Sequence, residues 1–134
     1  MDVLANFEVL FKARGLSAVH GRVFGTILLS DGKISQKEIA EQSGYSIPAV
    51  SIALDELVRL GLVEKEKHER TYFYSTDAKM SNIMKNFLLT IQRQYVEPFL
   101  RDCGSCPPTP GVKKLVQNMN DFDEYLSKLL EVKV

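Results

Sequence analysis

Residues 34–75 constrain the fold more than any other part of the chain, because they hold the start and stop signals of two helices in close succession. Ile34 is a candidate for a short strand. Ser35 and Glu38 have the spacing of a capping box, in which each side chain accepts a hydrogen bond from the other residue's backbone N–H. Gly44 supplies the left-handed backbone conformation that ends a helix. The pattern predicts a short, well-defined helix followed by a tight turn.

A second helix is predicted directly after that turn. Ser46 is its N-cap, Pro48 lies in the first turn, where a missing N–H costs nothing, and Gly61 ends it after Leu60. Its buried side is expected to consist of Val50, Leu54, Leu57 and Val58. The opposite side near its N-terminus is expected to carry Ile47, Ala49, Ser51, Ile52 and Asp55. For Asp55 we favour a cap or a pair with Arg59 over a base contact.

Two segments with strand character follow, residues 62–67 and 71–75. They predict a hairpin whose tip is residues 67–70, with the cationic or titratable side chains Lys67, His68 and Arg70. Helix, turn, helix and hairpin in this order predict a winged helix-turn-helix, in which the second helix enters a DNA major groove and the hairpin contacts phosphates or a minor groove. A solvated polar turn is the alternative for the hairpin tip, because three glutamates dilute its charge.

Two further helices are predicted before this motif. The first has apolar residues at spacings of three and four from Val3 to Phe11 and ends at Gly15; Ser17 caps the next. In the second helix Gly21 and Gly25 lie four residues apart, which favours close approach of a neighbouring helix over two glycines without a role. The predicted DNA-binding domain therefore spans residues 1–76.

Residues 77–134 are predicted to form a helical dimerisation region. One long helix from about Asp77 carries Met80, Ile83, Met84, Phe87, Leu88, Ile91, Tyr95 and Phe99, and Pro98 is expected to kink or end it. A second helix carries Val112, Leu115, Met119, Phe122, Leu126 and Leu129, a seam of about two and a half heptads. Such a seam favours a dimer; a helix hairpin within one chain is the alternative.

A turn-rich linker, residues 102–111, separates these two helices and holds the two cysteines of the chain, Cys103 and Cys106. Cys-x-x-Cys is found in redox pairs and in halves of metal sites. Neither histidine is close in sequence, and no strand precedes the motif. A neutral linker, a thiol sensor and a metal or disulfide site all stay open, and no cofactor is expected beyond them.

Composition and charge reduce the number of possible functions further. Lys plus Arg and Asp plus Glu both total 17, and residues 1–76 contain nine cations and ten anions, so any attraction to phosphate must come from local placement of cations. No apolar run approaches the length of a membrane span, which predicts a cytoplasmic protein. Catalytic motifs are lacking: there is no glycine-rich phosphate loop and no Gly-x-Ser-x-Gly, so we do not expect an enzyme.

Four runs together resemble the multiple-antibiotic-resistance repressor (MarR) superfamily, in particular its GbsR-like branch. They are residues 21–25 (Gly-Arg-Val-Phe-Gly), 39–46 (Ile-Ala-Glu-Gln-Ser-Gly-Tyr-Ser), the run from Val50-Ser51 to Leu60-Gly61-Leu62-Val63, and 70–74 (Arg-Thr-Tyr-Phe-Tyr). The resemblance covers residues 1–76 well and the remainder only in its helical character. It implies a mainly helical homodimer with a small β-wing that binds a palindromic operator in duplex DNA, most simply as a repressor.

Candidate site residues follow from the pattern and the resemblance together. The expected DNA contacts are Gln36, Lys37, Ser46, Ile47, Pro48, Ala49, Ser51, Ile52, Asp55, Lys67, His68 and Arg70. The expected dimer interface consists of Phe7, Phe11, Met84, Phe87, Ile91, Leu115, Met119, Phe122, Leu126 and Leu129. A small apolar effector is a further expected partner. A winged-helix module that binds protein instead of DNA, and a thiol- or metal-responsive sensor, are the alternatives.

Overall fold

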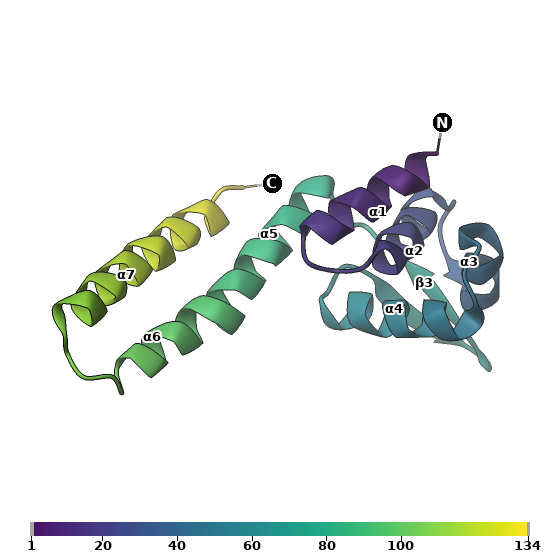
Figure 1. The fold of residues 1–134 in the computed structure, drawn as a ribbon. Helices are drawn as coiled ribbons and strands as arrows, with labels where there is room; N and C mark the ends of the chain where they lie inside the picture. The colour runs from purple at the N-terminus through teal and green to yellow at the C-terminus, as the bar shows by residue number, and fades with distance from the viewer. Residues whose placement is uncertain (1, 134) are drawn as a thin grey trace. The chain divides into compact units, whose positions relative to one another are not determined.

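The computed structural model describes residues 2–133, which form two compact units: unit 1 ends at Ala78 and unit 2 begins at Lys79. Most of the chain is helical, with one small antiparallel sheet in unit 1 (Figure 1). This confirms the predicted fold class, a mainly helical winged helix-turn-helix with a β-wing. None of the described helices is long and apolar enough to cross a membrane.

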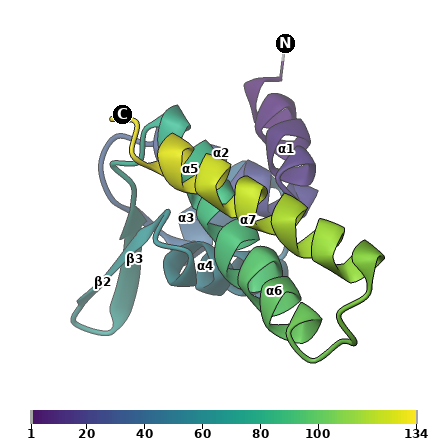
Figure 2. The ribbon, with the colours of Figure 1, turned by 90° about the vertical axis from the view of Figure 1, so that its left-hand side faces the viewer.

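Unit 1 contains four helices and three strands among its described residues. In chain order they are α1 (Val3–Ala13), α2 (Ala18–Leu29), β1 (Ile34–Ser35), α3 (Gln36–Ser43), α4 (Ile47–Arg59), β2 (Glu64–His68) and β3 (Thr71–Ser75). The strand order is β1-β3-β2, with Ile34 opposite Tyr74 and Lys67 opposite Tyr72. The β2–β3 hairpin is the wing, and it lies beside α3 and α4 (Figure 2).

Local signals define these elements as the sequence predicts. The Ser35–Glu38 capping box is present at the start of α3, and Gly44 ends that helix at φ 81°. Ser46 accepts from the N–H of Ala49 at the start of α4. The first strand of the wing begins two residues later than expected, at Glu64, because Leu62 and Val63 are buried in the turn that follows α4.

The core of unit 1 lies between α2 and the helices around it. Its fully buried side chains include Phe11, Phe24, Ile27, Ile39, Val50, Leu54 and Leu57, and Ala53 joins them, whereas Val58 is half-buried. The ring of Phe11 lies 5.2 Å from that of Phe24, and Phe7 lies 6.1 Å from Phe24. Phe7 and Phe11, expected at a dimer interface, are therefore core residues that hold α1 on α2.

Unit 2 is a helix hairpin. Its elements are α5 (Met80–Ile91), the π-helical segment η1 (Gln92–Val96), α6 (Glu97–Cys103) and α7 (Pro110–Leu130). The first helix begins at Met80, later than the expected Asp77. Pro98 does not end it, since the chain stays helical through Cys103. A π-helical turn before a proline accommodates the ring, which clashes with the preceding turn of a regular helix.

Helix α7 packs along α5, η1 and α6. Gln92 connects the two arms: its Nε2 donates to Asp123 Oδ1 at 3.0 Å and to Ser127 Oγ at 2.8 Å. Leu126 is the one fully buried side chain among the described residues of α7. Unit 2 is therefore an intramolecular helix hairpin, the alternative to a dimer seam. A large part of the apolar surface of α7 is not covered by the other helices of this hairpin.

Candidate nucleic-acid interface

The N-terminal part of α4 presents an exposed, mostly apolar surface. Ile52 is 71% exposed and Ile47 53% exposed. Ser46, Pro48 and Asp55 are also exposed, while Ala49 and Ser51 are half-buried. All seven residues had been predicted to contact DNA, and the structure places them on one helix start and its cap. This surface can enter a groove and touch base edges or thymine methyl groups.

A shallow hollow of about 190 Å³ borders this surface on the side of α2. It is lined by Ser17, Val19, His20, Ala49, Ile52 and Ala53. Ala49 is thus partly covered by the start of α2. Ile52 extends further from the helix and remains the most exposed large apolar side chain of α4.

Asp55 differs from the expectation. The sequence favours a cap or a pair with Arg59 for the Asp55 side chain. Arg59 instead forms its ion pair with Glu56, three residues before it. Within residues 2–133 no hydrogen bond or ion pair is formed by the Asp55 side chain. Its charge acts on Tyr74, whose pKa is raised by burial first and then by the Asp55 carboxylate. An exposed carboxylate without a partner suits an acceptor role toward a base amino group, and it repels phosphate.

The start of α3 and the tip of the wing meet at a second hollow, of about 410 Å³. Its lining residues are Ser35, Gln36, Lys37, Arg70, Thr71 and Tyr72. Gln36 also joins this hollow to α4, since its Nε2 donates to the Ile47 carbonyl at 3.4 Å. The fold thus brings Arg70 close to Gln36 and Lys37, which lie far from it in sequence, beside the exposed start of α4.

Charge on the wing is partly neutralised. Glu66 pairs with Lys33 and, at 3.0 Å, with Nε2 of His68. The hydrogen bond from Lys33, with a smaller contribution from His68, lowers the pKa of Glu66. Arg70 and Lys37, in contrast, form no ion pair within the described residues. Both cations are therefore available to an anionic partner.

Lys65 and Tyr72 of the wing were not among the predicted DNA contacts, whereas Lys67 was. The Nζ of Lys65 lies 4.1 Å from the centre of the Tyr72 ring, and Lys67 lies 5.5 Å from it. Lys65 and Lys67 alternate along β2, so they share one face, and strand register puts Tyr72 opposite Lys67. The alternation was visible in the sequence, whereas the partner aromatic depends on the register of the hairpin.

A polar network fixes the turn that leads into α4. Arg22 Nε donates to the Ser43 carbonyl at 2.8 Å, and the Tyr45 hydroxyl donates to Glu8 Oε1 at 3.0 Å. Arg22 also pairs with Asp2 at 3.1 Å, and this hydrogen bond lowers the pKa of Asp2. Burial, followed by the bond to Glu8, raises the pKa of Tyr45. These contacts tie α1 and α2 to the α3–α4 turn and so orient α4.

The two cysteines occupy different environments in unit 2. Cys103 is buried at the end of α6, and Cys106 is exposed in the turn that follows. Both are free thiols. The expected linker 102–111 is shorter in the structure, because Asp102 and Cys103 complete α6 and α7 begins at Pro110.

Comparison with known proteins gives the class of this fold. A family model described as MarR family matches residues 14–71, which run from the end of α1 to the start of β3. A search of curated proteins found no match. The crystal structure of a transcriptional regulator shares 18% sequence identity with a TM-score of 0.65, covering 95% of this chain and 92% of that one. At that identity the likeness shows a shared fold.

A second solved structure is MepR, a transcription regulator of the Staphylococcus aureus multidrug efflux pump MepA. It is 17% identical, with a TM-score of 0.45, and the match covers 94% of this chain and 89% of that chain. The MarR family match lies within the winged helix-turn-helix segment of the chain.

Proposed function

We propose that the chain is a DNA-binding transcriptional regulator of the MarR superfamily, in its GbsR-like branch. In this proposal it binds a palindromic operator as a homodimer and represses transcription by occupying that site. The observation that carries the proposal is the meeting of Lys37, Arg70 and the start of α3 beside the exposed face of α4. Unpaired cations and free backbone N–H groups at a helix start attract phosphate, and an exposed helix face fits a major groove.

Each part of the surface has a separate task in this mechanism. Ser51, Ile52 and Asp55 of α4 contact base edges and methyl groups, which provides sequence discrimination. Lys37 and Arg70, which line one hollow, contact phosphates beside the groove and hold α4 in register. Since residues 1–76 have no net positive charge, few phosphates are neutralised, so non-specific affinity is expected to be weak.

Anisotropy titrations of labelled genomic fragments at several salt concentrations test this function. Specific binding whose affinity falls steeply with salt is the expected result. Arg70→Ala should weaken binding to all sequences alike and reduce the salt slope by about one per protomer, and so by about two for the dimer. Arg93→Ala, an exposed arginine of unit 2, is the matched control and should leave both quantities unchanged. Wild-type affinity in Arg70→Ala would remove the wing from the interface.

A protein-binding winged helix is the second candidate, and the exposed isoleucines of α4 favour it. Ile47 and Ile52 form an apolar surface that carries no cation of its own. Exposed apolar side chains rimmed by polar ones are common at protein interfaces. If no genomic fragment is retained at low salt, the DNA-binding function is contradicted. Loss of a captured protein partner in Ile52→Glu would then support this candidate.

A further inference from the structure

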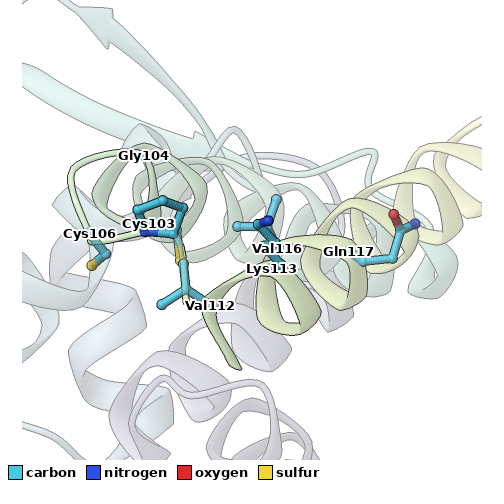
Figure 3. Close-up of a pocket in the computed structure, with 8 residues that line it drawn as sticks. Cys103, Gly104, Cys106, Val112, Lys113, Val116 and Gln117 are labelled. Carbon is cyan, nitrogen blue, oxygen red and sulfur yellow. The ribbon is translucent and has the colours of Figure 1, made fainter. Parts of the chain in front are cut away.

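Two thiols line one cavity in unit 2. Its volume is about 320 Å³, and its lining includes Cys103, Cys106, Pro108, Val112, Lys113 and Val116. In Figure 3 Cys103 ends α6 and Cys106 lies in the turn after it, while Val112, Lys113 and Val116 lie on the first turns of α7. The backbone N–H of Cys106 donates to the Cys103 carbonyl at 3.1 Å, which closes a turn that brings the two residues together.

The structure gives these thiols no other evident task. Cys103 is 7% exposed, and no hydrogen bond to its thiol is formed by the described residues. The Cys106 thiol makes a weak contact to the Asp102 carbonyl at 3.5 Å. The proposed DNA-binding surface belongs to unit 1 and uses neither. A buried thiol and an accessible thiol therefore face one cavity that has an opening for a small ligand.

The number of ligands restricts which metal ion suits this cavity. Within residues 2–133 no group of three or more His, Cys, Asp or Glu side chains is placed to hold a metal. A structural zinc ion needs four protein ligands, so one chain does not supply a zinc site. Thiolates select soft ions such as Cu(I). A monovalent soft ion accepts coordination by two sulfurs alone, which is the number of ligands present.

The charged groups around the cavity are compatible with a bound monovalent cation. Two thiolates and one Cu(I) carry a net charge of −1, and the Lys113 ammonium on the cavity wall balances it. Helix α6 ends at Cys103, and the partial negative charge at a helix C-terminus disfavours bare thiolates and favours a bound cation. A metal-bound pair is therefore better matched to this position than a reactive thiolate.

We infer that Cys103 and Cys106 form a binding site for one soft monovalent metal ion, of the Cu(I) class, per chain. On binding, two S–H bonds break, two S–Cu bonds form and two protons pass to solvent. The oxidation state of copper and sulfur does not change. The site is separate from the proposed DNA-binding surface, and it lies between the end of α6 and the first turns of α7.

Titration of the reduced full-length protein with Cu(I) under anaerobic conditions tests the site. A chromogenic Cu(I) chelator present as competitor should leave one copper per chain, with X-ray absorption showing a shell of two sulfurs. Cys106→Ser changes an exposed residue and should abolish this stoichiometric retention. Ser105→Ala, between the two cysteines, is the matched control and should retain copper. Circular dichroism confirms that both variants are folded.

Lys113 gives a second, milder test. Lys113→Gln should lower Cu(I) affinity by about tenfold, as loss of an outer-shell partner commonly does. Lys114→Gln changes a neighbouring lysine that does not line the cavity and should leave the affinity unchanged. Equal copper retention in wild type and Cys106→Ser overturns the inference. A preference for zinc, bound at one ion per two chains, also overturns the inference, because that stoichiometry indicates a four-thiolate site shared between chains.

Discussion

At Gly21 the backbones of α1 and α2 approach so closely that no side chain fits between them. A Cβ atom on this residue would lie 2.2 Å from the Phe7 carbonyl oxygen and 2.8 Å from the Glu8 Cα. At Gly25, one turn later, a Cβ would lie 2.7 Å from the Phe7 ring. The spacing of the two glycines had predicted such an approach, and the structure confirms it. The glycines thus set the position of α1, which carries the Glu8 partner of Tyr45.

Gly21→Ala is therefore expected to destabilise the protein. Alanine favours a helix by about 1 kcal/mol over glycine, but here the atom it would meet is backbone and cannot rotate away. We expect a net loss of about 2 kcal/mol in the free energy of unfolding, as for other overpacked sites. Urea unfolding followed by circular dichroism measures it.

Gly111→Ala in α7 is the matched control for that substitution. A Cβ at Gly111 would meet only the Thr109 hydroxyl, at an ordinary 3.9 Å, so the helix preference of alanine should act alone and stabilise the chain slightly. Unchanged stability in Gly21→Ala would show that α1 moves away from α2 at little cost.

At the scale of elements, the start of α2 depends on a histidine. Ser17 is the N-cap, as the sequence predicted, and its hydroxyl accepts from the N–H of His20. The return bond is made by the His20 ring, whose Nδ1 accepts from the Ser17 N–H at 3.2 Å. Only neutral histidine can accept there. Burial, and then the charge of Arg14, lower the pKa of His20, which keeps the ring neutral.

Stability should accordingly fall on mild acidification. In the unfolded chain His20 takes up a proton near its ordinary pKa of about 6.5, whereas the folded chain resists protonation. The unfolded state then binds more protons, so the free energy of unfolding decreases as pH falls through about 6.5 and below. His20→Gln should flatten this part of a stability–pH profile. A profile unchanged in His20→Gln would contradict the prediction.

Local signals explain why most elements were predictable and some features were not. Caps and glycine turns lie within a few residues of the helix ends they define, so Ser35 and Gly44 were sufficient to place α3. The π-helical turn before Pro98 was not predicted, because it depends on which new hydrogen-bond partners the backbone carbonyl and N–H groups near the proline find. Likewise, the burial of Phe11 depends on how α1 crosses α2, and the hollow between Lys37 and Arg70 depends on hairpin register.

At the scale of the whole molecule, α7 carries two apolar stripes with the same seven-residue spacing. Val112 and Met119 are half-buried and Leu126 is buried, on the side that packs within unit 2. Leu115, Phe122 and Leu129 are 37%, 40% and 36% exposed. The first stripe is accounted for by the hairpin. The second is the part of the predicted seam that is left for a partner, and we propose that a second copy of the chain covers it.

Met84, 54% exposed on α5, extends the apolar surface of unit 2, while Phe87 and Ile91 are half-buried. In a dimer these side chains and the outer stripe of α7 would bury each other. A dimer is also what recognition of two half-sites requires, since the two α4 helices must be held at a fixed spacing of about one DNA turn. In this proposal the assembly and the DNA-binding function are linked through unit 2.

Phe122→Glu should break this assembly. Burying a phenylalanine contributes about 2 kcal/mol, and twofold symmetry removes it from both copies, so the dimer dissociation constant should rise by about 100-fold or more. Sedimentation velocity over a range of protein concentrations measures the change. Asn120→Glu adds the same charge to another face of α7 and should leave the dimer intact.

Operator affinity should fall with Phe122→Glu in proportion to the loss of dimer, because each half-site contact then forms separately. A wild-type chain that sediments as a monomer at all concentrations would contradict the assignment of this stripe to a second copy.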